Sequence, residues 1–501
     1  MSRLTQRKSV ESLLEESKET DKGMKRNLTA FALIAIGIGA IIGAGLFVRT
    51  AAAAANNAGS AVTIGFIVAG IGCALAGLSY AELSSMIPIS GSAYTYSYAT
   101  MGEFVAWIIG WDLVLEYALG AATVSIAWSE YLNKLLEYFN FRIPYEWSHS
   151  PFDTITSATG VISHGIMNIP ALFIIAVLSL LLIKGSRESS LVNTIIVITK
   201  IAIVIVFIII GWSFINPANH TPFIPKPEVY TDSQGIPHNF GGILGILGAA
   251  GVVFFAFIGF DAVSTAAQET KNPKKAMPIG ILGSLAICTV LYILFSYVLT
   301  GVATVDDFRH EGKEASVVYA VQTYMTGFGW LAKLVTVAIL AGFSSVILVM
   351  LYGQSRVFYS MSKDGLIPPI FSELHKKYRT PYKSNLLFIL FVGLFAAFVP
   401  GDIVGDMTSI GTLFAFILVS LGVIIMRKTH PDLPRQFKTP FVPLVPILGI
   451  IVCGAMIFGL GWANWSRLLA WLAIGMVVYF LYSIKKSKLR NNKNEKNDIL
   501  E

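Results

Sequence analysis

Residues 37–47 read GIGAIIGAGLF, with four glycines inside an otherwise apolar run. Glycine in the middle of a helix costs about 1 kcal/mol relative to alanine, so this density of glycine needs a physical reason. Three interpretations compete. The stretch is a loop that holds a nucleotide phosphate, a face on which helices pack, or a helix interrupted inside a membrane.

The stretch belongs to a chain with the composition of a membrane protein. Of its 501 residues, 54% are hydrophobic and only 13% are charged, and the mean hydropathy is +0.67. In soluble domains, charged residues make up roughly a quarter of the sequence. The apolar residues also gather into blocks of about 20 residues, the length that a helix needs to cross roughly 30 Å of hydrocarbon.

Twelve of these blocks are predicted to span the membrane, which makes the fold class all-α and polytopic. Their approximate bounds are 29–55, 60–87, 101–132, 165–184, 189–211, 244–269, 276–302, 325–357, 383–400, 402–427, 441–463 and 467–485. Alternation of the spans places most of the 37 Lys and Arg residues on the side of both termini, which marks that side as cytoplasmic. We therefore expect a cell (plasma) membrane protein whose polar tails are disordered or lie on the membrane surface.

Two interpretations of the glycine-rich stretch explain it poorly or only in part. The spacing of Gly37, Gly39 and Gly43 is one residue too long for a dinucleotide fingerprint, and no acidic residue follows before Glu82. Gly39 and Gly43 do satisfy the GxxxG pattern of helix packing in membranes. Packing alone, however, leaves Gly45 without a purpose.

An interrupted helix accounts for the whole stretch. A break at residues 42–45 would free backbone N–H groups at the start of a second half-helix, where an anion binds well, while Gly37 and Gly39 let neighbouring helices approach. Transporters built from inverted repeats pair such a break with a second one. The span 244–269 carries Gly259 in mid-run and Asp261 shortly after it, and a second break there explains both residues. Asp261 then caps the restarted half-helix, with proton sensing as the alternative role.

The two breaks divide the chain into repeated units. Each opens a set of five spans, at 29–211 and at 244–427, as an inverted repeat requires. Residues 1–28 form an N-terminal tail, 441–485 two added helices, and 486–501 a C-terminal tail.

Four segments carry a resemblance to a known family. They are GIGAIIGAGLF at 37–47, YAELSSMIPISGSAYTY at 80–96, FFAFIGFDAVSTAAQE at 254–269 and GQSRVFYSMSKDGLIP at 353–368. The sequence resembles the amino acid–polyamine–organocation superfamily of permeases, close to bacterial members of the cationic amino acid transporter branch. This resemblance implies a LeuT-like fold, with twelve helices in a 5+5 inverted repeat and the substrate between broken helices 1 and 6.

The resemblance also implies a binding site. The substrate carboxylate meets backbone N–H groups in the first break, and the ammonium meets carbonyl groups of both breaks. The residues that map onto these roles are Ile41, Ile42, Gly43, Ala44, Gly45, Phe255 and Ile258. Phe255 closes the outer side of the site or serves ordinary helix packing. Phe343 and Ser345 of the eighth helix are the candidates for side-chain selection.

Lys200 and Glu116 are the candidates for proton coupling. Lys200 lies in the middle of the apolar span NTIIVITKIAIVIVFIII, where a charge marks an ion pathway or bonds to carbonyl groups as a structural residue. In related proton-coupled permeases a lysine amine stands at the matching position, where sodium-coupled relatives of the fold hold a cation. Glu116 is the expected carboxylate partner of Lys200 or a second proton carrier, unless it makes only a structural hydrogen bond.

These observations predict a secondary active transporter and no enzyme. The expected activity is proton-coupled uptake of small neutral L-amino acids such as alanine, serine or threonine, because Lys200 would engage the carboxylate of Glu116. A cationic amino acid permease or an exchanger is the alternative, and a non-transporting sensor shares the same motifs. We expect no cofactor, metal site or nucleic-acid partner. The partners are then the amino acid, protons and membrane lipid, whereas a small membrane partner and the oligomeric state stay open.

Overall fold

The computed structural model describes residues 6–18, 26–43, 45–156, 162–231, 237–310, 316–459 and 462–491. Helices dominate these ranges. The α-helices are α1 (Val10–Lys18), α2 (Ala30–Ile41), α3 (Thr50–Ala53), α4 (Val62–Met86), α5 (Ser92–Thr100), α6 (Glu103–Val114), α7 (Gly120–Glu137), α8 (Ile169–Lys184), α9 (Ser186–Trp212), α10 (Gly242–Phe254), α11 (Pro273–Val302), α12 (Val305–His310), α13 (Ser316–Tyr324), α14 (Gly329–Lys363), α15 (Tyr382–Phe398), α16 (Gly401–Thr429), α17 (Leu444–Gly459), α18 (Trp462–Val478) and α19 (Ile484–Lys486).

Short 3₁₀ and π segments join or interrupt several of these helices. The π turns are Gly45–Arg49, Ala54–Ala58, Leu115–Leu119 and Tyr479–Ser483, and the 3₁₀ segments are Gly59–Ala61, Tyr145–Trp147, Pro217–His220, Phe255–Phe257, Phe260–Glu269 and Pro369–Ser372. Two antiparallel hairpins complete the structure. They pair β1 (Thr154–Thr156) with β2 (Ile162–His164) and β3 (Glu228–Thr231) with β4 (Pro237–Phe240).

The helical stretches have the length and hydropathy of a membrane protein. In the described ranges, eight stretches are long and apolar enough to cross a membrane: Gly45–Met86, Glu103–Glu137, Ser189–Trp212, Gly242–Glu269, Pro273–Val302, Gly329–Lys363, Ile410–Thr429 and Trp465–Lys486. Four shorter apolar helices accompany them, at Ala30–Ile41, Ile169–Lys184, Tyr382–Phe398 and Leu444–Ile457. The prediction of a helical polytopic membrane protein is confirmed.

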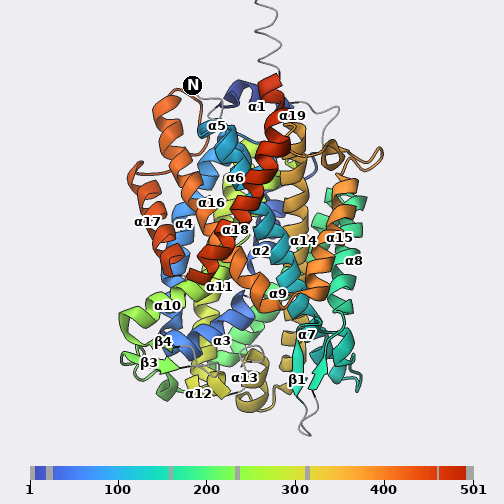
Figure 1. Cartoon of the computed structure of the whole chain (residues 1–501). Helices are drawn as coiled ribbons and strands as arrows, with labels where there is room; N and C mark the ends of the chain where they lie inside the picture. Colours follow the sequence, from blue (N-terminus) through green and yellow to red (C-terminus); the bar gives the residue numbers. More distant parts are fainter. Residues whose placement is uncertain are drawn as a thin grey trace, which may run out of the picture.

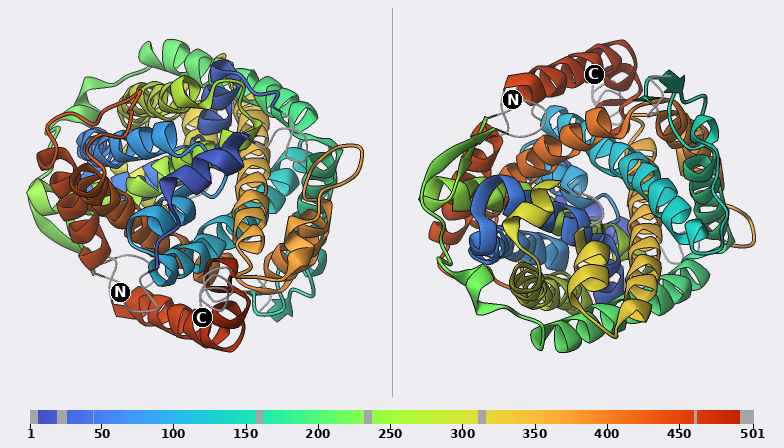
Figure 2. Two further views of the ribbon diagram at one scale, coloured as in Figure 1. Left: turned by 90° about the horizontal axis from the view of Figure 1, so that it is seen from above. Right: turned by 90° about the horizontal axis from the view of Figure 1, so that it is seen from below.

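The bundle has two distinct ends (Figure 1). Helices α1, α5 and α19 lie at one end, which we call the terminal end, and both hairpins lie at the other, which we call the hairpin end. Seen along the bundle (Figure 2), the blue α2 lies inside a ring of later helices, and the red α18 lies outside it. Because α2 is apolar on all sides, burial inside a bundle is its favourable position.

The glycines at the start of the opening stretch serve close helix packing, as predicted. A Cβ atom on Gly37 would lie 2.3 Å from the hydroxyl oxygen of Ser284 in α11, and one on Gly39 would lie 2.6 Å from Asn193 Oδ1 in α9. Two helices therefore approach α2 so closely that larger residues at these positions would push them away.

The N-terminal tail departs from the prediction. Residues 6–18 include α1, which buries Val10 and Leu13 with only 2% of each residue exposed. The backbone N–H of Glu103 donates to the carbonyl of Gln6 at 2.9 Å, so the tail is fixed to the start of α6. The expectation of a disordered or surface-bound tail was wrong here, because two apolar side chains of a mostly polar segment find a buried position between helices.

Candidate functional site

The first helix break lies where the sequence predicts it. Thr29 caps α2 by accepting a hydrogen bond from the N–H of Ala32, and the helix ends at Ile41. Ile42 then has an extended backbone, with φ −78° and ψ 100°, and helical structure resumes as a π turn at Gly45. Ala44, predicted to contact the substrate, lies outside the described residues. The break thus interrupts the chain between two apolar half-helices.

Both described glycines of this break are required by close packing. A Cβ atom on Gly45 would lie 2.2 Å from the Cα of Ala256, and one on Gly43 would lie 2.5 Å from Cγ2 of Val346. The backbone at Gly45 therefore touches the backbone of the second broken segment. This contact places the start of one half-helix against the interruption of the other.

The second break is also present. Helix α10 ends at Phe254, the 3₁₀ turn Phe255–Phe257 follows, and Ile258 is extended with ψ 136°. Gly259 has φ 109°, a left-handed conformation that suits glycine, and 3₁₀ helix then runs over Phe260–Glu269. Gly259 and not Asp261 occupies the cap position, so the predicted capping role of Asp261 is corrected.

A tyrosine joins the two breaks. The hydroxyl of Tyr292, in α11, lies 2.8 Å from the carbonyl oxygen of Ile41 and 2.9 Å from that of Ala256, so its single O–H is shared between these two acceptors. Its side chain is fully buried. Sequence reasoning missed Tyr292, because one tyrosine in an apolar span carries no local signal of a partner.

The other predicted contact residues lie around this junction. Ile258 is buried with 4% exposed, and Phe255 is half-buried beneath the guanidinium of Arg49, whose Cζ lies 5.3 Å from the ring centre. Phe343, in α14, is fully buried and packs edge-on against Tyr131 with ring centres 5.5 Å apart. The walls near the two breaks are therefore largely apolar.

Lys200 ties the end of α2 to α14. Its amine donates to the carbonyl of Ile42 at 2.7 Å, to the carbonyl of Gly39 at 3.2 Å and to the hydroxyl of Ser345 at 2.6 Å. The lysine comes from α9 and is fully buried. Ser345 lies 2.8 Å from the carbonyl oxygen of Gly39, so this predicted selectivity residue belongs instead to the lysine cluster.

Glu116 is not the partner of Lys200, so that prediction was wrong. All three hydrogen bonds of the Lys200 amine go to other groups, whereas the Glu116 carboxyl interacts with Asp261 and Thr412. Asp261 in turn accepts a hydrogen bond from Tyr117 at 2.6 Å. Glu116 lies on the π turn Leu115–Leu119, which packs against α16, whereas Lys200 extends from α9 onto α2. Lys200 and Glu116 thus belong to separate groups of buried polar side chains.

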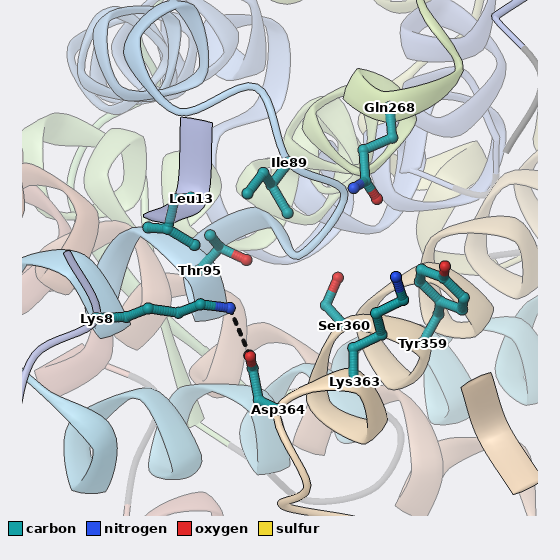
Figure 3. Close-up of a pocket in the computed structure, with 9 residues that line it drawn as sticks. All are labelled: Lys8, Leu13, Ile89, Thr95, Gln268, Tyr359, Ser360, Lys363 and Asp364. Carbon is teal, nitrogen blue, oxygen red and sulfur yellow. Dashed lines mark hydrogen bonds and ion pairs between the residues drawn. The ribbon is translucent and has the colours of Figure 1, made fainter. Parts of the chain in front are cut away.

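Ion pairs and backbone bonds close the terminal end. The amine of Lys8 lies 2.6 Å from Asp364 (Figure 3). Asp364 also accepts a hydrogen bond from Tyr94 at 2.7 Å. Around this pair the side chains of Thr95, Ser360 and Gln268 line a small cavity. These contacts tie the N-terminal tail to the end of α14 at this end of the bundle.

A second layer of contacts lies just inside. Leu28 precedes the cap residue of α2 and forms a parallel β-bridge with Thr270. The backbone N–H of Leu28 donates to the carbonyl of Glu269 at 2.9 Å. The Glu269 side chain pairs with Arg356 of α14 at 2.8 Å, and both are buried. The start of the first broken helix is thus attached directly to the end of the second.

Comparison with known proteins gives a family for this architecture. A family model described as "Amino acid permease" matches residues 28–482. The branched-chain amino acid permease BcaP of Bacillus subtilis (strain 168) is 44% identical over 485 residues, which cover 96% of this chain and 98% of that protein.

Two further relatives widen the range of named substrates. The methylthioribose transporter of Bacillus subtilis (strain 168) is 40% identical over 98% of this chain and 100% of its own. The cationic amino acid transporter 9, chloroplastic, of Arabidopsis thaliana is 37% identical over 87% of this chain and 73% of its own. All three relatives are named as permeases or transporters and none as an enzyme. With a family match over nearly its whole length, this multi-pass membrane protein belongs to the amino acid permease family and is an amino acid transporter.

Proposed function

We propose that this transporter couples amino acid uptake to protons by alternating access in a LeuT-like fold. The fold proposal is supported by the two interrupted helices, which open the sets 29–211 and 244–427, and by apolar helix at each of the twelve expected spans. Transporters of this kind bind substrate where the two interruptions meet. The contact between Gly45 and Ala256 is such a meeting point.

The substrate backbone binds at this junction. Its carboxylate takes the N–H groups at the start of the half-helix, at Gly43–Gly45, because the first N–H groups of a helix lack intrahelical partners and carry partial positive charge. Its ammonium takes carbonyl groups of Ile41, Phe255 and Ile258. Tyr292 supports this arrangement, because its hydroxyl fixes the carbonyl of Ile41 beside the second break.

The substrate is a neutral amino acid. Ile258 and Phe343 offer apolar walls, which favour small neutral side chains and extend naturally to branched ones. The relative named a branched-chain amino acid permease supports leucine, isoleucine and valine as first substrates to test. A cationic substrate is the second candidate, because Glu116 does not pair with Lys200 and relatives named cationic amino acid transporters align over most of the chain.

Proton coupling rests on the amine of Lys200. An ammonium has three N–H donors, and the structure presents three acceptors to it, on Gly39, Ile42 and Ser345. A neutral amine has only two N–H donors and no charge, so loss of the proton weakens the attraction between Lys200 and the two carbonyl groups and with it the tie between α2 and α14. The proton thus controls whether the half-helix before the break stays attached. Glu116, within its cluster with Asp261, is the second proton carrier.

The terminal end faces the cytoplasm in this proposal, and the hairpin end faces outward from the plasma membrane. The concentration of Lys and Arg on the side of the termini supports this orientation. In the arrangement described, Lys8 and Asp364 close the cytoplasmic route. Uptake then requires their separation after the substrate has bound.

Transport by purified protein in proteoliposomes tests the proposal. An inward proton gradient should drive accumulation of labelled leucine or alanine in empty vesicles, which separates symport from exchange. Lys200→Met should reduce this accumulation by about tenfold or more while counterflow of label persists. Lys134→Met, in the last turn of α7 at the hairpin end, is the matched control. Full gradient-driven accumulation by the Lys200→Met protein would remove the lysine from the coupling mechanism, and binding without counterflow would identify a sensor.

A further inference from the structure

Arg49 lies directly above the junction of the two breaks. It is the last residue of the π turn Gly45–Arg49, one helical turn beyond the break, and it points over the ring of Phe255. Phe255 is the neighbour of Ala256, which touches Gly45. A guanidinium and an aromatic ring, one from each broken segment, therefore meet over the place where the segments touch.

The charge of Arg49 has no obvious structural purpose. In the described part of the chain the guanidinium has no carboxylate partner, and it lies against the face of Phe255 instead. A guanidinium stays protonated in proteins, so this is a permanent positive charge within an apolar span. Such charges are costly in a membrane and mark substrate or ion pathways. Both Arg49 and Phe255 are only half-buried, as expected for groups beside a route to the site.

Arg309 provides a contrast within the same protein. It also stacks on aromatic rings, with its Cζ 3.9 Å from the centre of Tyr230, but it has Asp306 at 3.6 Å and Glu228 at 4.0 Å. Its charge is compensated, and it fastens the β3–β4 hairpin to α12. Arg49 lacks this compensation and lies one turn from the break.

We propose that the charge of Arg49, held over the ring of Phe255 beside the amino acid site, rejects amino acids with cationic side chains. This inference rests on the proposed position of the substrate between the two breaks. The fixed charge attracts the carboxylate that every amino acid carries and repels a second positive charge on the side chain. At an effective dielectric of about 20, two like charges about 8 Å apart disfavour binding by roughly tenfold or more.

Arginine and citrulline test the charge without changing the shape of the ligand. Citrulline has the length and planarity of arginine but a neutral urea group. With purified full-length protein in proteoliposomes, each is tested as an inhibitor of labelled leucine uptake. We expect citrulline to inhibit at a concentration about tenfold or more below that of arginine, as the charge repulsion predicts.

Variants assign this preference to Arg49. Arg49→Gln should narrow the ratio of the two inhibition constants to about threefold or less, whereas Arg49→Lys should keep it, because the charge remains. Arg142→Gln removes an exposed arginine, 69% exposed at its side chain, near the hairpin end and should leave the ratio unchanged. If Arg49→Gln does not purify as a folded protein, Arg49→Met takes its place, and the same ratio of inhibition constants is measured.

The outcomes separate the inference from the function on which it rests. Equal inhibition by arginine and citrulline in the original protein overturns the inference, as does an unchanged ratio in Arg49→Gln, while leucine transport stands in both cases. If no amino acid tested shows saturable binding or uptake, the proposed function itself is overturned. A narrowed ratio in Arg49→Gln that Arg49→Lys does not share supports the inference.

Discussion

The amine of Lys200 lies 2.7 Å from the carbonyl oxygen of Ile42, the residue at which the first broken helix leaves its α-helical conformation. A helix end carries carbonyl groups that lack intrahelical partners and partial negative charge, so a cation there stabilises the end. Lys200 supplies that cation from a different helix and joins α14 through Ser345 at the same time. One side chain thus connects the break, its supporting helix α9 and the long helix α14.

Gly43→Val should abolish amino acid binding without preventing membrane insertion. The valine side chain would enter space that Val346 occupies, 2.5 Å from its methyl group, and would displace the backbone of the break. Binding-induced thermal stabilisation of the purified protein measures the effect, with an expected loss of affinity of about a hundredfold. Gly454→Val, where nothing lies within 4 Å, is the control on α17. Normal affinity in Gly43→Val would contradict the proposed site.

Tyr292→Phe should destabilise the protein and weaken binding together. The change removes one hydroxyl and leaves the buried carbonyls of Ile41 and Ala256 without that donor, which costs about 1–3 kcal/mol. Thermal unfolding in detergent measures the stability, and titration with leucine measures the affinity. Tyr297→Phe on the same helix, whose ring packs against Trp212, should change neither quantity appreciably. Unchanged affinity in a destabilised Tyr292→Phe protein would mean that the tyrosine supports the fold only.

Glu116→Gln should reduce gradient-driven uptake by about tenfold and leave counterflow largely intact. The carboxyl group is fully buried and lies close to that of Asp261, so it is placed to exchange a proton inside the bundle. The amide keeps the shape but cannot exchange that proton. Gradient-driven uptake is measured with unequal pH across the vesicle membrane, and counterflow is measured with equal pH on both sides. Glu137→Gln, at the exposed end of α7, is the control, and an equal loss of counterflow in Glu116→Gln would argue for a purely structural role.

Asp364→Asn should open the terminal end more often. The change removes the charge that holds Lys8 at 2.6 Å and weakens the bond from Tyr94. A cysteine introduced at Ser360, which lines the adjoining cavity, should react several-fold faster with a membrane-impermeant maleimide. The native cysteines Cys73, Cys288 and Cys453 are buried and give little background.

Glu373→Gln provides the control for Asp364→Asn. It breaks the partly exposed ion pair with Lys383, in which the two side chains are 49% and 35% exposed, and should leave the labelling rate unchanged. Equal labelling of Asp364→Asn and the original protein would show that the Lys8 pair does not restrain this end.

His220 should make the protein less stable at acidic pH. His220 lies outside the membrane spans, and its ring packs against Tyr297. Burial lowers the pKa of His220 below its usual value near 6.5. The unfolded state then binds more protons than the folded one, so stability is lost as the pH falls through about 6.5 and below. His220→Phe keeps the ring packing and removes the titration. Its unfolding temperature should therefore fall less than that of the original protein between pH 7 and pH 5, and parallel decreases would contradict this assignment.

Several features of the site could be predicted from the amino-acid sequence alone. Glycine inside a helix and a charge inside an apolar span are both energetically costly, so they indicate function. Gly43, Gly259 and Lys200 are residues of this kind, and they can be recognised in the sequence alone. The same reasoning missed Tyr292, because a tyrosine is not an unusual residue in a membrane span. Sequence reasoning also assigned no role to Arg49, because only the tertiary structure shows that its guanidinium lies over the ring of Phe255.

The sequence by itself thus determined that this is a helical membrane transporter with two interrupted helices and a buried lysine, because composition and single costly residues are visible without any partner. Only the tertiary structure decided which groups those residues meet. Lys200 of α9 reaches the carbonyl group of Ile42, and Glu116, on the π turn Leu115–Leu119, lies close to Asp261 of the second broken segment. Partners that lie far apart in the chain depend on which helix faces pack together, and that choice is made by the packing of the whole bundle.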